Sequence, residues 1–527
     1  MERRTEIVRE QAARFLQRAG DFRLGNLPTE GRHPLTYELA DLARHDLPQA
    51  LHIVKQIDCF SIERVLGKSP DVAELSDRMH GCMAKGHRVF LYGCGATGRL
   101  SLSLEYLWRF VHQGSSGEDS VRGFMSGGDL ALVHSIEDFE DHPEFGARQL
   151  GEIGFRADDL LVSCTEGGET PSVIGATEAA AASARTAPCF LYCNPDDVLC
   201  TQVERSRRVL QDPRIDKLNL YVGPMSLSGS TRLQASTALM LGAGAALLRD
   251  SPAEFPSIDL AAFLDFLNQL DTSFLIPFIE AESAIYARGE HILYETNHYG
   301  ITILTDTTER APTFSLLGFE NQDDLLRRPS PSFLCLSEAV DASSAWRQIL
   351  LREPITLEWE GMATVAGKRR LLGFDFSRRA REHRQALLQG APQHVFQIRK
   401  RGHHLVMELG AHQASLDVSS LHPLCEHVLL KILLNTHSTL VMGRLGRYES
   451  NLMTWVRPSN NKLIDRAIRY VAYLLAREGV DPMFSYEDIA CQCFEEMQDL
   501  TPDESIVLKT VAALRRISSG KPIAIDR

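Results

Sequence analysis

A short apolar run that ends in closely spaced glycines constrains this chain more than any other feature. Residues 88–92 read Arg-Val-Phe-Leu-Tyr, and residues 93–98 read Gly-Cys-Gly-Ala-Thr-Gly. Glycines permit a tight turn, and the free N–H groups of a helix that follows them face an anion. The pattern predicts an α/β fold with a phosphate-binding loop. The ligand-binding residues expected in it are Gly93, Gly95, Ala96, Thr97 and Gly98.

Enzymes that bind nicotinamide dinucleotides carry a similar loop. Their second strand ends in an acidic residue, roughly 20 residues past the glycines, that holds the ribose hydroxyls. Here the second strand is expected at residues 120–126 and ends without Asp or Glu, whereas Glu118 and Asp119 precede it. A dinucleotide site is therefore disfavoured, and no cofactor is expected.

Composition narrows the class of protein. With 527 residues, 44% of them hydrophobic, the chain is too long for a single core. A net charge of −13 without a basic stripe argues against a nucleic-acid partner. The N-terminus is charged, and the longest apolar stretch, residues 238–248, is too short to span a membrane. The 11 cysteines form no Cys-x-x-Cys pair, which favours reduced thiols, no metal site and a cytoplasmic protein.

Apolar runs and helical segments alternate twice along the chain. Continuous apolar runs are typical of parallel strands that are covered on both faces. The strands expected in the first round are residues 87–93, 120–126, 159–164, 188–193 and 217–222. The second round is less regular, with antiparallel character in residues 361–420. Its expected strands are residues 289–294, 312–317, 332–336, 354–359, 395–399 and 404–409.

The fold class expected from this alternation is α/β, with two doubly wound parallel-sheet domains in tandem. A Ser-Pro-Ala-Glu-Phe-Pro segment at residues 251–256 reads as the linker between them. A helical N-terminal arm and a small helical C-terminal cap complete the chain. The expected boundaries are 1–50 for the arm, 51–250 and 257–460 for the two domains, and 461–527 for the cap.

The motifs, taken in order, resemble the sugar isomerase (SIS) family of phosphosugar-binding domains. Within that family they are most similar to the branch that holds N-acetylmuramic acid 6-phosphate etherase and the glucokinase regulatory protein. Two such domains in one chain, with a helical cap, resemble the regulatory protein's arrangement. The matching segments are residues 27–30, 34–36, 93–99, 126–129, 137–141, 170–171, 194–195, 223–224, 228–232, 305–309, 431–436 and 460–463.

The resemblance implies one pocket between the two domains. It places a second phosphate loop at residues 164–170, with Thr165, Glu166, Gly167 and Thr170 as ligand-binding residues. An ionised Glu166 would repel a phosphate dianion, so its side chain must point away or the ligand must carry less charge.

The family's two functional glutamates correspond to Glu140 and Glu309 here, and we take them as the catalytic candidates. Glu140 is also consistent with a solvated acidic helix face. The first domain carries Leu107 where the family has its second glutamate, and the second domain lacks two loop glycines. The first domain would then supply the phosphate loop and Glu140, and the second domain would supply Glu309.

Lys431 lies in an otherwise apolar helical run, residues 428–434. A buried ammonium is unfavourable unless an anion compensates it. We therefore expect Lys431 to bind the ligand, and its removal to leave the free protein as stable or more stable. The alternative is that the aliphatic part of Lys431 packs at the edge of a domain while its ammonium reaches solvent.

The function expected from these features is binding of a phosphorylated hexose or amino sugar by a regulatory protein. A sugar kinase or another protein would be its partner. The alternative is an N-acetylmuramic acid 6-phosphate etherase, which eliminates D-lactate by general acid–base catalysis with two glutamates. Both functions place acidic residues in one cleft, so the sequence leaves open whether the protein is an enzyme.

Overall fold

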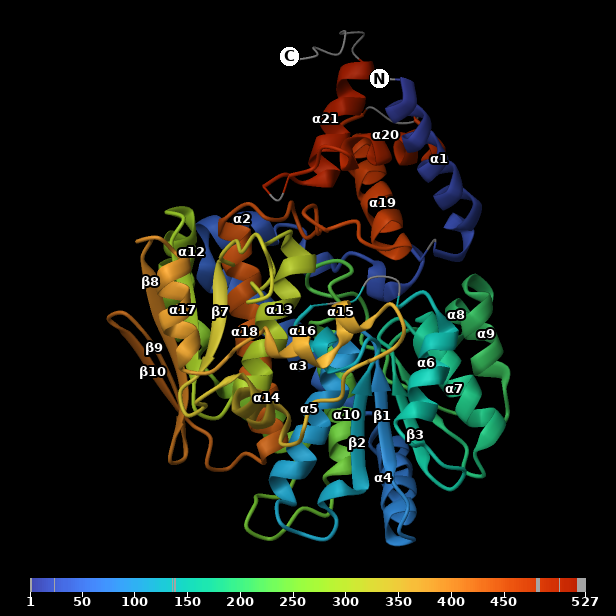
Figure 1. Cartoon of the computed structure of the whole chain (residues 1–527), viewed down its shortest axis with the longest axis vertical. Coiled ribbons are helices and arrows are strands. Elements are labelled where there is room, and N and C mark those ends of the chain that lie inside the picture. The colour runs from blue at the N-terminus through green and yellow to red at the C-terminus, as the bar shows by residue number, and fades with distance from the viewer. Residues whose placement is uncertain are drawn as a thin grey trace.

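The computed structural model describes residues 2–22, 24–134, 136, 139–479, 484–501 and 503–518. Figure 1 shows two α/β bodies side by side, with a group of helices standing above them. The two acids Glu137 and Asp138 of the matched segment 137–141, and the last residues of the expected cap, 519–527, lie outside the described residues.

The first sheet is fully parallel, as the sequence predicted, and has the order β2-β1-β3-β4-β5. Because β2 pairs with one side of β1 and β3 with the other, the strand order reverses at β1. A crevice outside the carboxyl ends of the strands at such a point is where open α/β sheets bind ligands. The strands are β1 (Val89–Gly93), β2 (Val121–Met125), β3 (Leu160–Cys164), β4 (Cys189–Tyr192) and β5 (Asp216–Asn219).

Helices cover both faces of this sheet. Alternate residues of a strand point to opposite faces. Val89 and Leu91 pack in the core shared with α5 and α10, whereas Phe90 and Tyr92 pack in a second core beneath α7. The helices that surround the sheet are α3 (Leu47–Leu66), α4 (Ser69–Ala84), α5 (Ala96–Val111), α6 (Pro143–Glu152), α7 (Pro171–Ser183), α8 (Asp196–Gln202), α9 (Glu204–Gln211) and α10 (Gln234–Leu247).

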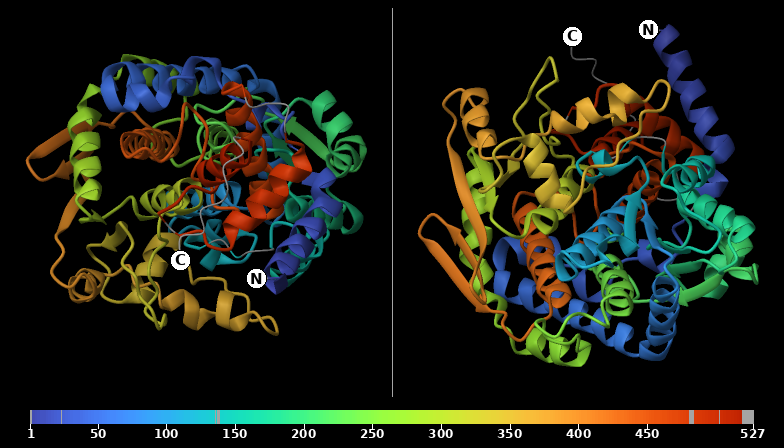
Figure 2. Two further views of the ribbon diagram at one scale, coloured as in Figure 1. Left: turned by 90° about the horizontal axis from the view of Figure 1, so that it is seen from above. Right: turned by 60° about the horizontal axis from the view of Figure 1, so that its bottom comes forward.

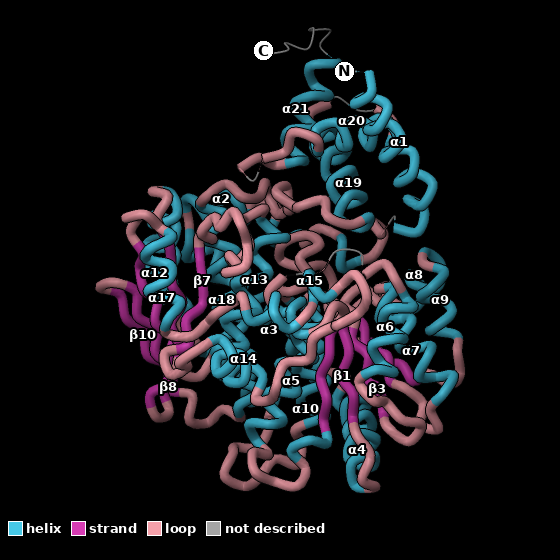
Figure 3. The backbone as a smooth tube through the Cα atoms, in the orientation of Figure 1, coloured by secondary structure: helices cyan, strands magenta, loops and turns pink. Residues whose placement is uncertain are grey.

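The second sheet is mixed and has the order β10-β9-β8-β6-β7. β6 (His291–Thr296) runs parallel to β7 (Ser332–Leu336) and β8 (Gln393–Arg401). The antiparallel character expected after residue 361 is present, because β9 (His404–Leu409) and β10 (His412–Asp417) form a meander with β8. Figure 3 shows the strands gathered in these two separate groups.

Two of the expected strands are absent from the second domain. Residues 312–314 form the last turn of helix α13 (Gly300–Phe314), and Ser315 ends it with a left-handed φ of 52°. A short apolar run does not by itself distinguish a strand from a buried helix end. Residues 354–359 form no strand because they leave their own sheet and pack against the first domain.

Helix α18 (Pro423–Arg444) lies in the middle of the molecule. It packs against α12 (Ile276–Ala287) and α13 of the second domain and against α10 of the first. Contacts with both domains bury the helix on all faces from Pro423 to Gly443. The other helices of this domain are α11 (Leu260–Gln269), α14 (Ala342–Leu350), α15 (Ala363–Ala366), α16 (Lys368–Leu372) and α17 (Arg379–Leu387).

The C-terminal cap consists of α19 (Asn461–Arg477), α20 (Tyr486–Met497) and α21 (Ile506–Ser518). Helix α1 (Glu2–Arg18) packs on it, with the rings of Phe15 and Phe494 5.7 Å apart, and Figure 2 shows α1 beside the cap from two further directions. Helix α2 (Leu39–His45) instead packs on α18. Among the described helices, none combines the length and apolar character needed to cross a membrane.

A buried carboxylate fastens the N-terminal region to the cap. Glu30 accepts two hydrogen bonds from Arg466, at 2.6 and 3.0 Å, and one from Arg469 at 3.0 Å. Burial raises the pKa of Glu30, but the two guanidinium groups outweigh this and lower it to about 2. Glu30 therefore stabilises the fold in its charged form.

Glu30→Gln is expected to show what this carboxylate contributes. Because its pKa is lowered on folding, the contribution is present above pH 4.5 and declines as the pH falls toward 2. The shift corresponds to about 3 kcal/mol. Urea unfolding of wild type and variant at several pH values measures it: the difference should be largest above pH 5 and shrink below 4.5. The exposed neighbour Glu38 supplies the control, Glu38→Gln, and a difference that is independent of pH contradicts the assignment.

Candidate functional site

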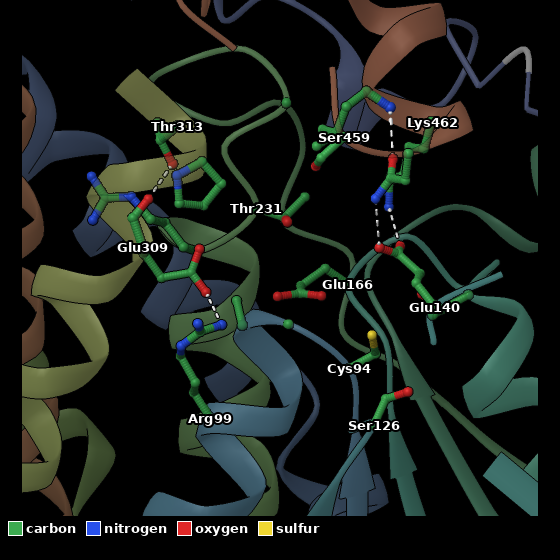
Figure 4. A pocket seen from close by; sticks show the side chains of 18 of the residues that line it. Cys94, Arg99, Ser126, Glu140, Glu166, Thr231, Glu309, Thr313, Ser459 and Lys462 are labelled. Atoms are coloured by element: carbon green, nitrogen blue, oxygen red, sulfur yellow. Dashed lines mark hydrogen bonds and ion pairs between the residues drawn. The ribbon is translucent and has the colours of Figure 1, made fainter. Parts of the chain in front are cut away.

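A pocket lies at the carboxyl ends of β1 and β3, where the two domains and the cap meet. The volume of its cavity is about 180 Å³, and it opens to solvent. The first domain contributes Gly95, Ala96, Glu140, Glu166 and Thr170. The second contributes Glu309 and Thr313, and the cap region Ser459, Asn460 and Lys462. Figure 4 shows Glu140, Glu166, Glu309 and Lys462 around one space.

The glycine loop takes the shape that the sequence predicted. Gly95 has φ +57° and ψ −123°, a conformation that only glycine adopts readily, and it precedes the first residue of α5. A Cβ on Gly93 would lie 2.4 Å from the carbonyl carbon of Thr97, so the loop could not close with another residue there. Gly95 and Ala96 line the pocket, which puts the amino end of α5 beside it.

Thr97 has its hydroxyl satisfied within the loop. The hydroxyl donates to the carbonyl of Cys94 at 2.9 Å and accepts from the N–H of Cys94 at 3.1 Å. Gly98 packs under β2, where a Cβ would lie 2.5 Å from that of Met125. Gly93, Thr97 and Gly98 therefore shape the loop and do not line the pocket.

The second loop brings two of its four expected residues to the pocket. Thr165 and Thr170 share a hydrogen bond of 2.9 Å, and Thr170 lines the pocket with Glu166. Gly167 faces away, and its carbonyl accepts from Asn194 at 2.9 Å.

Glu166 lies near the centre of the pocket, between Glu140 and Glu309 (Figure 4). Burial raises its pKa to about 7, although a 2.9 Å hydrogen bond from Ser236 favours the charged form. A carboxyl group with that pKa is protonated part of the time at neutral pH. The repulsion that the sequence suggested between Glu166 and an anionic ligand is correspondingly reduced.

Glu140 is held by the cap. Its carboxylate accepts from the side-chain amide of Asn460 at 3.2 Å, and the Lys462 ammonium lies 3.6 Å away. Lys462 also pairs with Glu169 at 2.7 Å. Burial raises the pKa of Glu140, and Lys462 opposes that shift. A raised pKa brings a carboxyl group closer to the range in which it can act as an acid as well as a base.

Glu309 reaches the same pocket from α13 of the second domain. It forms a 2.6 Å ion pair with Arg99, which comes from α5 of the first domain. Arg99 is almost fully buried and also donates to the carbonyl of Leu132 at 3.2 Å. The structure thus brings the two candidate glutamates together from opposite domains (Figure 4).

Lys431 does not line this pocket. Its ammonium donates to the carbonyls of Arg232 and Leu233 at 2.9 and 3.2 Å, to Thr237 at 2.8 Å and to Asn435 at 3.0 Å. It borders a smaller neighbouring cavity that Ala96 and Glu309 also line. Burial lowers the pKa of Lys431. Protein acceptors thus take the hydrogen bonds that the sequence assigned to a ligand.

Besides Arg466, which binds Glu30, three cations that line the pocket were not predicted from the sequence as site residues. They are Arg99, Lys462 and Arg232, which pairs with Asp306 at 2.9 Å. Arg232 is 4% exposed and lines the pocket, and its Nε has no partner among the described residues. All three lie in segments 93–99, 228–232 and 460–463, which carry the resemblance, so the motifs themselves were the available signal.

The remaining chemistry of the pocket offers no metal site. Within the described ranges, no group of three or more His, Cys, Asp or Glu side chains is placed to hold a metal ion. The Cys94 thiol lines the pocket, and burial raises its pKa, which keeps it protonated and weakly nucleophilic.

The chain is similar to a domain of a known regulatory protein and to known etherases. Residues 71–181 match the model of the glucokinase regulatory protein N-terminal SIS domain. An N-acetylmuramic acid 6-phosphate etherase of Aeromonas hydrophila is 30% identical over 218 residues, which are 41% of this chain and 67% of that protein. The etherase of Mesorhizobium japonicum is 34% identical over 217 residues, 41% of this chain, and the match spans 64% of its length.

Among solved structures, the tagatose-6-phosphate ketose/aldose isomerase of Escherichia coli covers 75% of this chain and 92% of its own, at 11% identity and a TM-score of 0.38. A likeness of that size carries no argument about function. The family model and the etherase relatives, together with the two α/β domains and the glycine loop at the sheet's switch point, lead to one conclusion. The chain belongs to the SIS family.

Proposed function

We propose that this protein binds a phosphorylated hexose or amino sugar in the pocket between its two domains and that it acts as a sugar-phosphate-responsive regulator. The observation that carries the proposal is the composition of the pocket. Glu140, Glu309 and Lys462 come from the first domain, the second domain and the cap, and all three line the same space.

The pocket has the two kinds of group that a sugar phosphate needs. The amino end of α5, the Lys462 ammonium and the Arg232 guanidinium suit a phosphate, which prefers cations and N–H donors. The carboxylates of Glu140 and Glu309 suit sugar hydroxyls, which donate hydrogen bonds. Thr170 lines the same pocket, and its hydroxyl can donate a hydrogen bond to a phosphate oxygen.

A ligand held by three parts of the chain would favour the arrangement in which those parts are closed together. Ligand binding shifts a protein toward the conformation that binds it better. A change in how the cap sits on the domains would alter a surface available to a partner. A sugar kinase is the partner we propose, by analogy with the regulatory protein whose domain model matches.

An etherase activity is the second candidate. Two observations favour it: the relatives are named N-acetylmuramic acid 6-phosphate etherases, and burial raises the pKa of both Glu140 and Glu166. Carboxyl groups with raised pKa values suit an elimination that needs a base and an acid. Lactate would be the second product of that reaction.

Incubation with N-acetylmuramic acid 6-phosphate separates the two functions. For a regulator, we expect a rise in melting temperature with this ligand, glucosamine 6-phosphate or tagatose 6-phosphate, and no released lactate. Glu140→Gln and Glu309→Gln should each weaken binding about tenfold or more, since each removes a charged acceptor. Isothermal titration calorimetry measures the affinities, and a colorimetric assay measures lactate.

Glu144→Gln is the matched control, because Glu144 is an exposed carboxylate four residues from Glu140. Lactate release that is lost in both pocket variants and kept in the control supports the etherase and rejects the regulator. The absence of a melting shift with all three sugar phosphates, and of lactate, contradicts both functions.

A further inference from the structure

A segment of the second domain crosses to the first and packs against the residues that hold Glu140. This crossing segment, residues 352–359, follows α14 and precedes α15. All of its residues are described, and none of them lines the pocket. Its role is therefore separate from ligand contact.

The crossing segment begins with a buried ion cluster. The Arg352 guanidinium pairs with Glu105 of α5 at 2.9 Å and with Asp129 at 2.5 Å. The side chains of Glu105 and Asp129 are each 1% exposed. Breaking a buried pair by removing one partner is strongly unfavourable, so this contact fixes where the segment enters the first domain.

The backbone of the segment then pairs with the turn that follows β2. The N–H of Asp129 donates to the carbonyl of Ile355 at 3.0 Å, and the N–H of Ile355 donates to the Asp129 carboxylate at 2.6 Å. Gly128 has φ +72°, and a Cβ there would lie 3.2 Å from the Ile355 carbonyl. The turn is thus shaped to receive the segment.

Trp359 ends the segment beside Phe139. The residue is 7% exposed, and its ring stacks on that of Phe139, with ring centres 5.5 Å apart and planes inclined by 21°. Its indole N–H donates to Glu152 at 2.6 Å, and the Arg148 guanidinium lies 4.0 Å from the ring centre. Phe139 immediately precedes Glu140, so the indole holds the chain next to the candidate acid.

The backbone on the other side of Phe139 is held as well. The Ser126 hydroxyl donates to the carbonyl of Phe139 at 3.3 Å, and the N–H of Ser172 donates to the carbonyl of Glu140 at 3.1 Å. With Trp359 packed on Phe139, the chain at Glu140 is held from the sheet, from α7 and from the second domain.

We propose that Trp359 is a positioning residue: through Phe139 it fixes the backbone of Glu140, so that the second domain sets the geometry of a first-domain carboxylate. The inference deepens the proposed function, because affinity for a sugar phosphate would then depend on a residue outside the pocket.

Hydrogen exchange and ligand binding test this together. In Trp359→Ala, exchange in peptides that cover residues 165–180 should be at least fivefold faster than in wild type, because the Ser172 amide loses a fixed acceptor. Binding of N-acetylmuramic acid 6-phosphate should weaken about tenfold. Trp359→Phe keeps an aromatic ring on Phe139 and should restore most of both properties.

Glu353→Gln is the matched control, because Glu353 lies in the same segment and pairs only with the exposed Arg347 in the described structure, at 3.0 Å. If Trp359→Ala does not fold, Trp359→Leu, which has no stacking ring, replaces it. Unchanged exchange at residues 165–180, or no rescue by phenylalanine, overturns the positioning role. Faster exchange in a protein whose wild type binds no sugar phosphate supports the positioning role and rejects the proposed function.

Discussion

Lys431→Ala is expected to lower the free energy of unfolding by about 3 kcal/mol, contrary to what the sequence suggested. The ammonium donates to Arg232, Leu233, Thr237 and Asn435, and the side chain is 8% exposed. Its removal takes one donor from each of these buried acceptors, of which the Leu233 carbonyl keeps the donors of Thr237, and it leaves a cavity between α10 and α18. Urea unfolding in the absence of ligand measures the loss.

Lys55→Ala is the control for this experiment. Lys55 also donates to two backbone carbonyls, those of Asn268 and Leu270, but it is only half-buried, and its loss should lower the free energy of unfolding by less than about 1 kcal/mol. If Lys431→Ala is as stable as wild type without ligand and loses only stabilisation by sugar phosphate, then Lys431 binds the ligand, as the sequence suggested.

Lys462→Gln is expected to weaken binding of a sugar phosphate about 100-fold, or about 2.7 kcal/mol. The ammonium lies in the pocket with its charge shared between Glu169 and Glu140. Without it, Arg466, which already binds Glu30, is the cation that remains on that side of the pocket. The pKa of Glu140 should also rise further, because Lys462 is the charge that most strongly opposes the effect of burial. Calorimetry with glucosamine 6-phosphate and N-acetylmuramic acid 6-phosphate measures the affinity.

Lys509→Gln serves as the comparison, because Lys509 belongs to the same cap and pairs with Glu504 at 3.1 Å away from the pocket. It should bind within about twofold of wild type, since partly exposed ion pairs contribute little. An affinity for Lys462→Gln within threefold of wild type would place the phosphate elsewhere in the pocket.

The fold was largely predictable where secondary structure depends on the pattern of neighbouring residues. The strands of the first sheet are mostly apolar, β5 with Asp216 and Lys217 being partly exposed, and each was found within a few residues of its expected place. Residues 312–317 and 354–359 look similar in sequence but are not strands. The first belongs largely to a helix end, and the second pairs with Asp129 of the other domain. The residues of the run 354–359 carry no sign of this partner, because it lies in the other domain.

The candidate site was predictable in part. Glu140 and Glu309 came from motif resemblance, and the structure brings both to one pocket. The placement of Lys431 was not predictable, because its acceptors include two backbone carbonyls about 200 residues away and carry no side-chain pattern.

By itself, the sequence determined the alternation of strands and helices and the glycine turn at residues 93–98, because backbone sterics and hydrophobic periodicity are properties of neighbouring residues. The tertiary structure alone decided which charges face the pocket and which are satisfied within the protein. That outcome depends on burial and on pairing between distant segments, as between Glu309 and Arg99 or Lys462 and Glu169, since removal from water is favourable for a charge only when a partner is in place.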